Sequence, residues 1–184
     1  MGGGGATHGR LVHEDNELHF KGGKERYIII PLRAYAEIIN SFASIVGEAV
    51  GGPLTFLGKR IAYGLVEELQ HRLSVSHKQA NIENLVQEYA RFLSELGFGK
   101  IEVKEVGEDH AIVYMHSPPS MDGIRAADDK VLEMLKKGKK ICYLEAGMIA
   151  GVFEKIIGGK FRAFEVERGD LDNPYCVIRV ERVS

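Results

Sequence analysis

Cysteine is scarce in this sequence, and no stretch of it stays apolar for long. Two cysteines, Cys142 and Cys176, stand in a chain of 184 residues. We therefore expect no disulfide framework and a reducing, cytoplasmic location. No apolar run reaches the roughly 18 residues that a membrane-spanning helix requires. The first ten residues, MGGGGATHGR, lack the apolar core of a secretory signal, and residues 1–9 are expected to form a flexible tail.

Neither sign of charge is in excess, and the common catalytic motifs are missing. The formal net charge is −2 without a long basic run, so we expect no direct binding of nucleic acid, which needs clustered positive charge. The chain contains no nucleophile elbow, P-loop, H-E-x-x-H motif, C-x-x-C pair or dinucleotide-binding glycine motif. These absences do not decide whether the protein is an enzyme, but they weigh against it.

The spacing of apolar residues predicts an α+β protein. Residues 10–30 have the pattern of a small β-meander around the turn pair Asp15-Asn16, with Tyr27–Ile30 as a buried strand. Helical spacing predicts two amphipathic helices within 35–73 and a third that begins at the N-cap Asn81 and ends at Gly97. The other expected elements are strands 100–106 and 110–116, a loop over 117–123, a short surface helix over 126–138, a helix over 141–157 and a closing hairpin of strands 161–168 and 175–182.

The helix expected over 141–157 is apolar nearly all round, which is typical of a buried helix. It also carries a patch of small residues: Ala146, Gly147, Ala150 and Gly151. Each glycine inside a helix costs about 1 kcal/mol relative to alanine, so a backbone or a ligand is expected to approach this patch closely. The overall expectation is a helical layer packed on an antiparallel sheet, with this long buried helix before a C-terminal β-hairpin.

One segment resembles a known family. Residues 142–180, CYLEAGMIAGVFEKIIGGKFRAFEVERGDLDNPYCVIRV, combine a cysteine that opens a glycine-rich apolar helix, a strand, a Gly/Asp turn and a second cysteine that opens the last strand. This pattern resembles the vinyl-4-reductase domain family, also called hydrocarbon-binding proteins. The resemblance implies a fold related to the small subunits of the Golgi transport-particle complex, to nitric-oxide-signalling ligand domains and to bacterial phenol sensors. It implies a ligand-binding domain over 33–184, preceded by a tail (1–9) and a β-meander appendage (10–32).

The resemblance implies that the chain binds a small hydrophobic molecule, such as a hydrocarbon, an aromatic or a lipid-like compound, as a sensor or carrier. Related proteins pair through this fold, and the helices within 35–73 hold more apolar positions than one inner face needs, so a homodimer is expected. The residues expected to line the pocket are Phe56, Tyr63, Tyr143, Gly147, Ile149, Gly151 and Phe153. Two alternatives stay open: a reductase-associated protein that acts on a vinyl tetrapyrrole, and a protein-interaction module that resembles the transport-particle subunits.

The phenol sensors that share this resemblance build a zinc site at the positions matching Cys142, Glu165, Arg168 and Cys176. Here the third position is arginine instead of cysteine, and its positive charge disfavours a site that normally takes four ligands. Strand alternation also puts Glu165 on the face opposite to its neighbours, Phe164 and Val166. Two interpretations remain: zinc on Cys142, Glu165 and Cys176, or two buried thiols beside a carboxylate that pairs with Arg168. No other cofactor is expected.

Overall fold

The computed structural model describes residues 11–21, 25–73, 81–124, 133 and 137–183. Its main sheet is antiparallel, with the strand order β4-β5-β7-β6. The strands are β4 (Lys100–Val106), β5 (His110–His116), β6 (Lys160–Arg168) and β7 (Tyr175–Val183). Two hairpins supply these strands, and the pairing of β5 with β7 joins the hairpins into one sheet.

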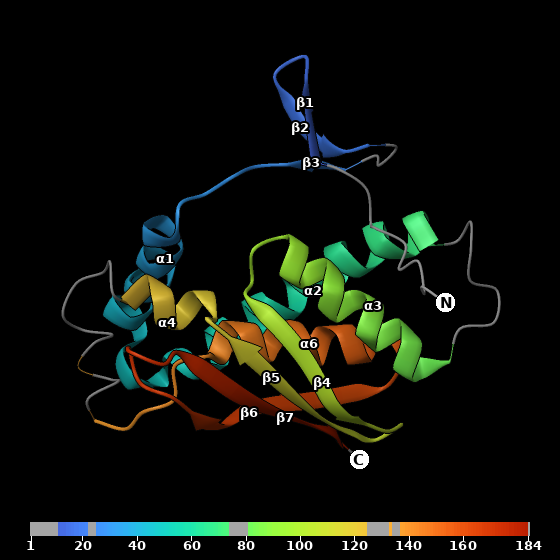
Figure 1. Ribbon diagram of the computed structural model, residues 1–184. Helices are drawn as coiled ribbons and strands as arrows, with labels where there is room; N and C mark the ends of the chain where they lie inside the picture. The colour runs from blue at the N-terminus through green and yellow to red at the C-terminus, as the bar shows by residue number, and fades with distance from the viewer. Residues whose placement is uncertain (1–10, 22–24, 74–80, 125–132, 134–136, 184) are drawn as a thin grey trace.

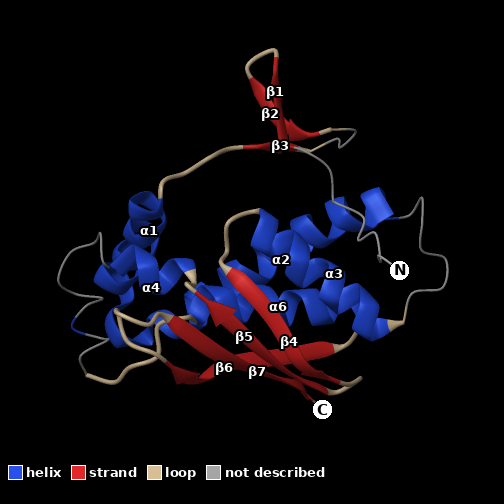
Figure 2. Cartoon of the chain, viewed as in Figure 1, coloured by secondary structure: helices blue, strands red, loops and turns tan. Residues whose placement is uncertain are grey.

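Helices cover one face of this sheet (Figures 1 and 2). Helix α6 (Tyr143–Ile156) lies against β6, α2 (Gly51–Leu73) covers α6 on the side away from the strands, and α3 (Ile82–Glu95) packs against β4 beside α6. At one end of this layer α1 (Leu32–Val46) packs against α4 (Pro119–Ile124), and a 3₁₀ turn over Gly47–Val50 leads from α1 to α2. The predicted α+β class, with a buried helix before the closing hairpin, is confirmed. Among the described helices, none is both long enough and apolar enough to span a membrane.

Helices α2 and α6 pack backbone to backbone. The residues Leu144–Phe153 are all buried, because the sheet covers one side of α6 and the helices cover the other. A Cβ atom on Gly147 would collide with the carbonyl oxygen of Thr55, and one on Gly58 would collide with the backbone of α6 in the same way. Gly151 also faces the backbone of α2. The group that approaches the small-residue patch is therefore the neighbouring helix.

The ends of α3 follow from local signals that the sequence already contains. The Asn81 side chain accepts a hydrogen bond from the backbone N–H of Asn84 at 2.8 Å, which caps the first turn. Past the other end, Gly97 has a φ of 93°, a conformation that favours glycine. The predicted boundaries of this helix are confirmed.

A second, smaller sheet precedes the helices. It consists of β1 (Leu11–Glu14), β2 (Glu17–Phe20) and β3 (Arg26–Tyr27) in that order. Asp15 and Asn16 form the first turn with positive φ angles of 50° and 63°, as the predicted meander requires. Phe20 at the end of β2 is buried, and its ring lies 5.7 Å from the ring of Phe92 on α3. This contact attaches the small sheet to the helical layer.

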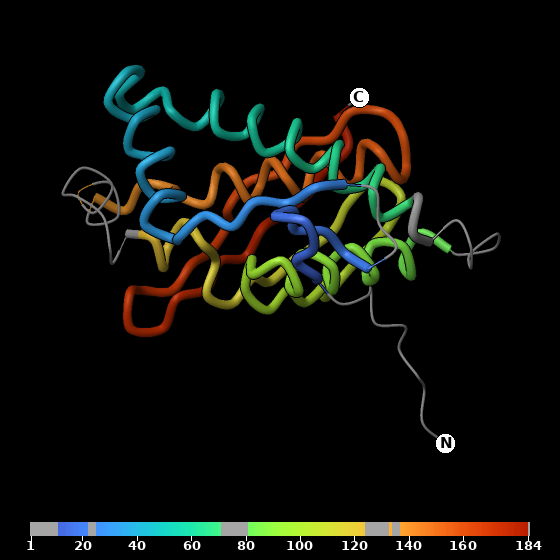
Figure 3. The backbone as a smooth tube through the Cα atoms, turned by 90° about the horizontal axis from the view of Figure 1, so that it is seen from above, coloured from blue at the N-terminus to red at the C-terminus, as the bar shows by residue number. Residues whose placement is uncertain are grey.

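The prediction of a buried strand over Tyr27–Ile30 is wrong beyond its first residue. Ile28 and Ile29 are 79% and 78% exposed, and no described strand pairs with them. The stretch Ile28–Ile30, here called the isoleucine strap, runs from the small sheet toward α1 and passes between α2 and α3 in the view from above (Figure 3). A run of β-branched residues indicates strand propensity but does not supply a partner strand.

Two further expectations concern the segment after β5. The loop expected over 117–123 is a short helix from Pro119 onward, and proline is common at this first helical position. The surface helix expected over 126–138 lies mostly outside the described residues, so it stays a prediction.

The contact between α2 and α6 predicts opposite effects for two glycine substitutions. Gly147→Ala should lower the free energy of unfolding by about 3 kcal/mol, because the new methyl group forces two backbones apart. Gly64→Ala, on the open side of α2, should raise it by up to about 1 kcal/mol through helix propensity. Urea denaturation of both variants measures the difference. Equal changes in the free energy of unfolding of the two variants would contradict a backbone contact at Gly147.

Candidate functional site

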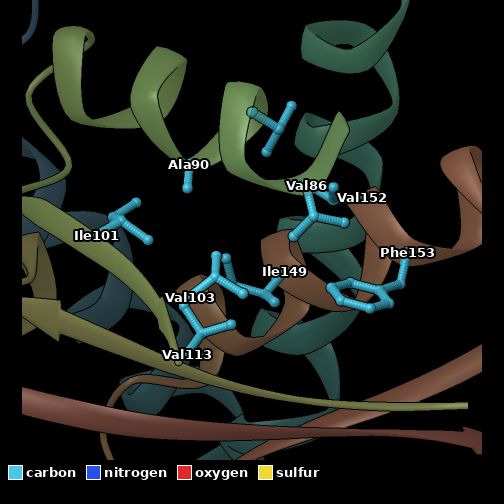
Figure 4. Close-up of a pocket in the computed structure, with 9 residues that line it drawn as sticks. Val86, Ala90, Ile101, Val103, Val113, Ile149, Val152 and Phe153 are labelled. Carbon is cyan, nitrogen blue, oxygen red and sulfur yellow. The ribbon is translucent and has the colours of Figure 1, made fainter. Parts of the chain in front are cut away.

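A small apolar cavity lies between α3, α6 and the strands β4 and β5 (Figure 4). Its volume is about 10 Å³, the space that one water molecule needs. Its lining consists of Val86, Tyr89, Ala90, Ile101, Val103, Val113, Ile149, Val152 and Phe153. Apart from one tyrosine, every lining side chain is a hydrocarbon.

Three periodic patterns bring these residues together. Helix α3 presents Val86 and Ala90, which are one turn apart. Strand β5 turns alternate residues inward, including Val113. Helix α6 supplies Ile149 and Phe153, again one turn apart, from the side opposite the sheet. The short side chain of Ala90 leaves part of the space between these elements unfilled.

The structure separates the seven residues that the sequence proposed for a ligand pocket. Ile149 and Phe153 line the cavity, whereas Gly147 and Gly151 face the backbone of α2. Phe56 is 66% exposed on α2. The Tyr63 hydroxyl donates to Glu154, and the Tyr143 ring packs against Gly51. That the seven proposed residues contact a ligand stays a prediction. The cavity also requires residues of α3, β4 and β5 that the sequence analysis did not propose for a pocket.

A fully buried carboxylate, Glu145, ties three helices together. Its Oε1 accepts hydrogen bonds from the Ser120 backbone N–H at 2.8 Å and from the Tyr35 hydroxyl at 3.1 Å. Its Oε2 accepts from the Ser120 hydroxyl at 2.6 Å. Burial raises the pKa of Glu145 above its ordinary value, although these donors oppose the shift. The sequence signal was a single charge in the first turn of an otherwise apolar helix, which indicates a buried and partnered group.

The two cysteines meet where α6 begins. Cys142 is the N-cap residue of α6, Cys176 is the second residue of β7, and both are buried free thiols. A hydrogen bond between the two thiols, together with burial, raises the pKa of Cys142 well above its ordinary value. Burial and a raised pKa make Cys142 a poor nucleophile.

Glu165 lies beside these thiols and holds the start of α6. Its Oε2 accepts hydrogen bonds from the backbone N–H groups of Ile141 and Cys142, both at 3.1 Å. Its Oε1 lies 3.6 Å from Arg168, whose guanidinium also donates to the carbonyl oxygen of Lys139. This carboxylate and this guanidinium join β6 to the segment that leads into α6.

Strand alternation predicted the side of Glu165 relative to its neighbours, but not which side is the core. Glu165 points inward with Ala163, whereas Val166 is exposed on the other face. The register of β6 against β7 shifts between Glu165 and Glu167, so a β-bulge ends the regular alternation here. An inward carboxylate at this bulge is what reaches the start of α6.

The residues proposed for zinc do not fit the metal. Among the described residues, no group of three His, Cys, Asp or Glu side chains is arranged to hold an ion. The oxygens of Glu165 already face two N–H donors and a guanidinium. A carboxylate with these partners has little capacity left for a divalent cation.

Comparisons with known proteins assign the fold. No family model matches the chain. An uncharacterised protein of Methanocaldococcus jannaschii is 28% identical over 99 residues, which are 54% of this chain and 51% of that protein, so the match spans about half of the curated relative.

Three solved structures share the fold. The phenol-responsive sensory domain of the transcription activator PoxR, solved with phenol, has a TM-score of 0.73 at 13% identity over 94% of this chain and 84% of that one. Subunit 3 of a trafficking protein particle complex from Naegleria fowleri, covalently bound to palmitic acid, has a TM-score of 0.59 at 13% identity over 83% and 95%. A vinyl-4-reductase family protein from M. jannaschii has a TM-score of 0.52 at 20% identity over 86% and 85%. The resemblance stated from the sequence is thereby confirmed at the level of the fold.

The raised pKa of Glu145 predicts a pH dependence of stability. In the folded state this carboxyl keeps its proton above the ordinary value of 4.5, where the unfolded chain has released it. The free energy of unfolding should therefore fall as pH rises from that value through the raised pKa. Glu145→Gln lacks the titrating group and should not show this decline, as urea denaturation from about pH 4.5 to 8 measures. As a control, Glu67→Gln removes an exposed carboxyl whose pKa is lowered, so it should not flatten the curve; parallel curves for wild type and Glu145→Gln would contradict the assignment.

Proposed function

We propose that the chain binds a small hydrophobic molecule, as a sensor or carrier, at the apolar cavity between α3, α6 and the sheet. The observation that carries this proposal is the lining, in which eight of nine side chains are aliphatic or phenyl groups from four elements. A concave apolar site with few polar groups is typical of small-molecule binding. In this proposal, residues 33–184 form the binding domain and residues 10–32 are an appendage to it.

The structural neighbours support this class of ligand. One sensory domain with the same fold was solved with phenol, and one complex subunit carries covalently bound palmitic acid. Both ligands are largely apolar, and both proteins match most of this chain in fold. Because the identities are 13%, the neighbours support the fold and the general class of ligand, and the choice of compound rests on the cavity.

Binding requires the cavity to grow, since about 10 Å³ does not hold an organic molecule. The side of α6 that faces α2 is in backbone contact and cannot move outward without losing that contact. On the other side α3 ends at a turn with Gly97 and Gly99, both at positive φ, before β4 begins. A shift of α3 away from α6 therefore enlarges the cavity at the lowest cost in packing.

Two matched substitutions test the location of the ligand. Ile149→Val enlarges the cavity by one methylene group and should strengthen the binding of toluene severalfold, since a larger apolar cavity accepts an aromatic ring more readily. Ile178→Val makes the same change at a buried position outside the lining. Each of the two substitutions should lower the free energy of unfolding by about 0.5–1.5 kcal/mol. Titration of toluene, followed by protein NMR chemical shifts, measures affinity.

A third variant acts in the opposite direction. Ala90→Val fills the cavity and should weaken toluene binding. Identical affinities in all three variants, or shifts that avoid the lining residues, would contradict a ligand site at this cavity.

We also propose that a second copy of the chain covers the exposed isoleucines. The isoleucine strap leads directly into α1, on which Ile38 and Ile45 are seven residues apart and so lie on one side. Ile45 is 82% exposed. Burial of one isoleucine side chain contributes about 1.5–3 kcal/mol, and in a two-fold dimer each contact occurs twice. Such a dimer accounts for apolar positions that the core of a single chain does not use.

This proposal predicts the mass in solution. Light scattering should give about twice the chain mass of 20.4 kDa. The double substitution Ile29→Asp, Ile45→Asp should shift the particle to the monomer, because it places charges in an apolar interface. Val166→Asp, at an exposed valine on the sheet, should leave the dimer intact. A monomeric wild-type protein at high micromolar concentration would rule the dimer out.

A further inference from the structure

Four aromatic rings join the small sheet to α3. The ring of Phe20 on β2 lies 5.2 Å from that of Tyr27 on β3 and 5.7 Å from that of Phe92 on α3. Tyr89 precedes Phe92 by one helical turn on the same side of α3, and the centroids of these two rings are 6.3 Å apart. Burial raises the pKa of the Tyr89 hydroxyl, and the neighbouring Tyr27 raises it further. These four residues, here called the aromatic cluster, form the contact between the small sheet and α3.

The aromatic cluster is what holds the small sheet in place. Phe20 is the one buried residue among those that the structure describes in β1, β2 and β3. Strand β3 is two residues long, and a sheet of this size needs packing against a helix to be stable. The connection to α1, the isoleucine strap, is exposed. A unit held by so few buried groups is expected to separate from α3 before the rest of the fold opens.

The aromatic cluster also borders the wall of the cavity. Tyr89 is one of the lining residues and a neighbour of Tyr27, so it lies between the cavity and the small sheet. In the proposed binding, the cavity grows on the α3 side, which moves Tyr89 away from α6. The small sheet and the main sheet lie on opposite sides of the helical layer (Figure 1), so the rings of Phe20 and Tyr27 stand in the direction of this movement. The docked small sheet therefore opposes the growth of the cavity.

We propose that the docked small sheet keeps the ligand site closed, and that ligand binding releases the small sheet from α3. The proposal rests on the ligand site proposed above and specifies its regulation. The coupling is reciprocal, because the factor by which a ligand favours release is also the factor by which release strengthens ligand binding. Release exposes Phe20 and Tyr27 to water, so a bound ligand changes the apolar surface that a partner can contact.

The first test removes the docking contact. Phe20→Asp places a charge in the buried aromatic cluster and should release the small sheet. The affinity for toluene, followed by the NMR chemical shifts of the Ile149 methyl groups, should then rise about fivefold or more. Ile149 reports the cavity from the α6 side, so toluene that binds at the vacated place of Phe20 is not counted. Leu11→Asp, on β1 of the same sheet at a position that is 38% exposed, is the matched control and should leave the affinity unchanged.

A second measurement uses the wild-type protein and does not depend on the folding of a variant. Amide hydrogen exchange in β1 and β2 should quicken by the same factor when toluene is bound, whereas exchange in β7 should not quicken. An unchanged affinity in Phe20→Asp, an equal rise in Leu11→Asp, or unchanged exchange in β1 and β2 overturns the coupling and leaves the ligand site standing. Failure of toluene to bind the wild-type protein and both variants overturns the proposed function, and the coupling with it.

Discussion

The contact between the backbones of α2 and α6 is the constraint on which the rest of the structure depends. It exists because Gly58, Gly147 and Gly151 have no side chains to keep the two helices apart. With α2 on one side and the sheet on the other, α6 is closed off from water along nearly its whole length. The polar groups at its start cannot be hydrated, so the protein itself has to provide their partners.

Two carboxylates provide those partners from different directions. Glu165 comes from β6 and accepts the first free N–H groups, while Glu145 comes from the first turn of α6 and receives donors from Ser120 and Tyr35. Both carboxyl groups lie near the N-terminal end of α6, where the helix dipole favours acidic groups. The residues for which the sequence left zinc open are therefore held here by hydrogen bonds, with Arg168 and the backbone of Lys139 completing the connection.

Local sequence signals predicted much of the fold, whereas contacts between elements far apart in the chain could not be predicted from the sequence. Asn81 and Gly97 mark the ends of α3 through interactions within a few residues, so they can be recognised without knowing the rest of the chain. Glu165 points inward in alternation with Phe161 and Ala163, but the pattern of one strand does not reveal which of its faces the helices cover. Small residues in α6 indicated a close approach but not which element approaches. The cavity depends on residues from four elements, and only Ile149, Val152 and Phe153 among them belong to the helix that drew attention.

The two sides of α6 are packed differently, and the proposed ligand site depends on this difference. Residues two apart on a helix point about 200° away from each other, so Gly147 and Gly151 face α2 while Ile149 and Phe153 face the cavity. On the glycine side, carbonyl groups touch the partner backbone, and any separation loses many contacts at once. On the cavity side, side chains of Val, Ile and Ala leave a gap, and α3 closes it from outside under the cover of Phe20. The α2–α6 contact is close, and the packing between α6 and α3 is incomplete. In the proposed binding, the helical layer therefore opens between α3 and α6, and the α2–α6 contact is kept.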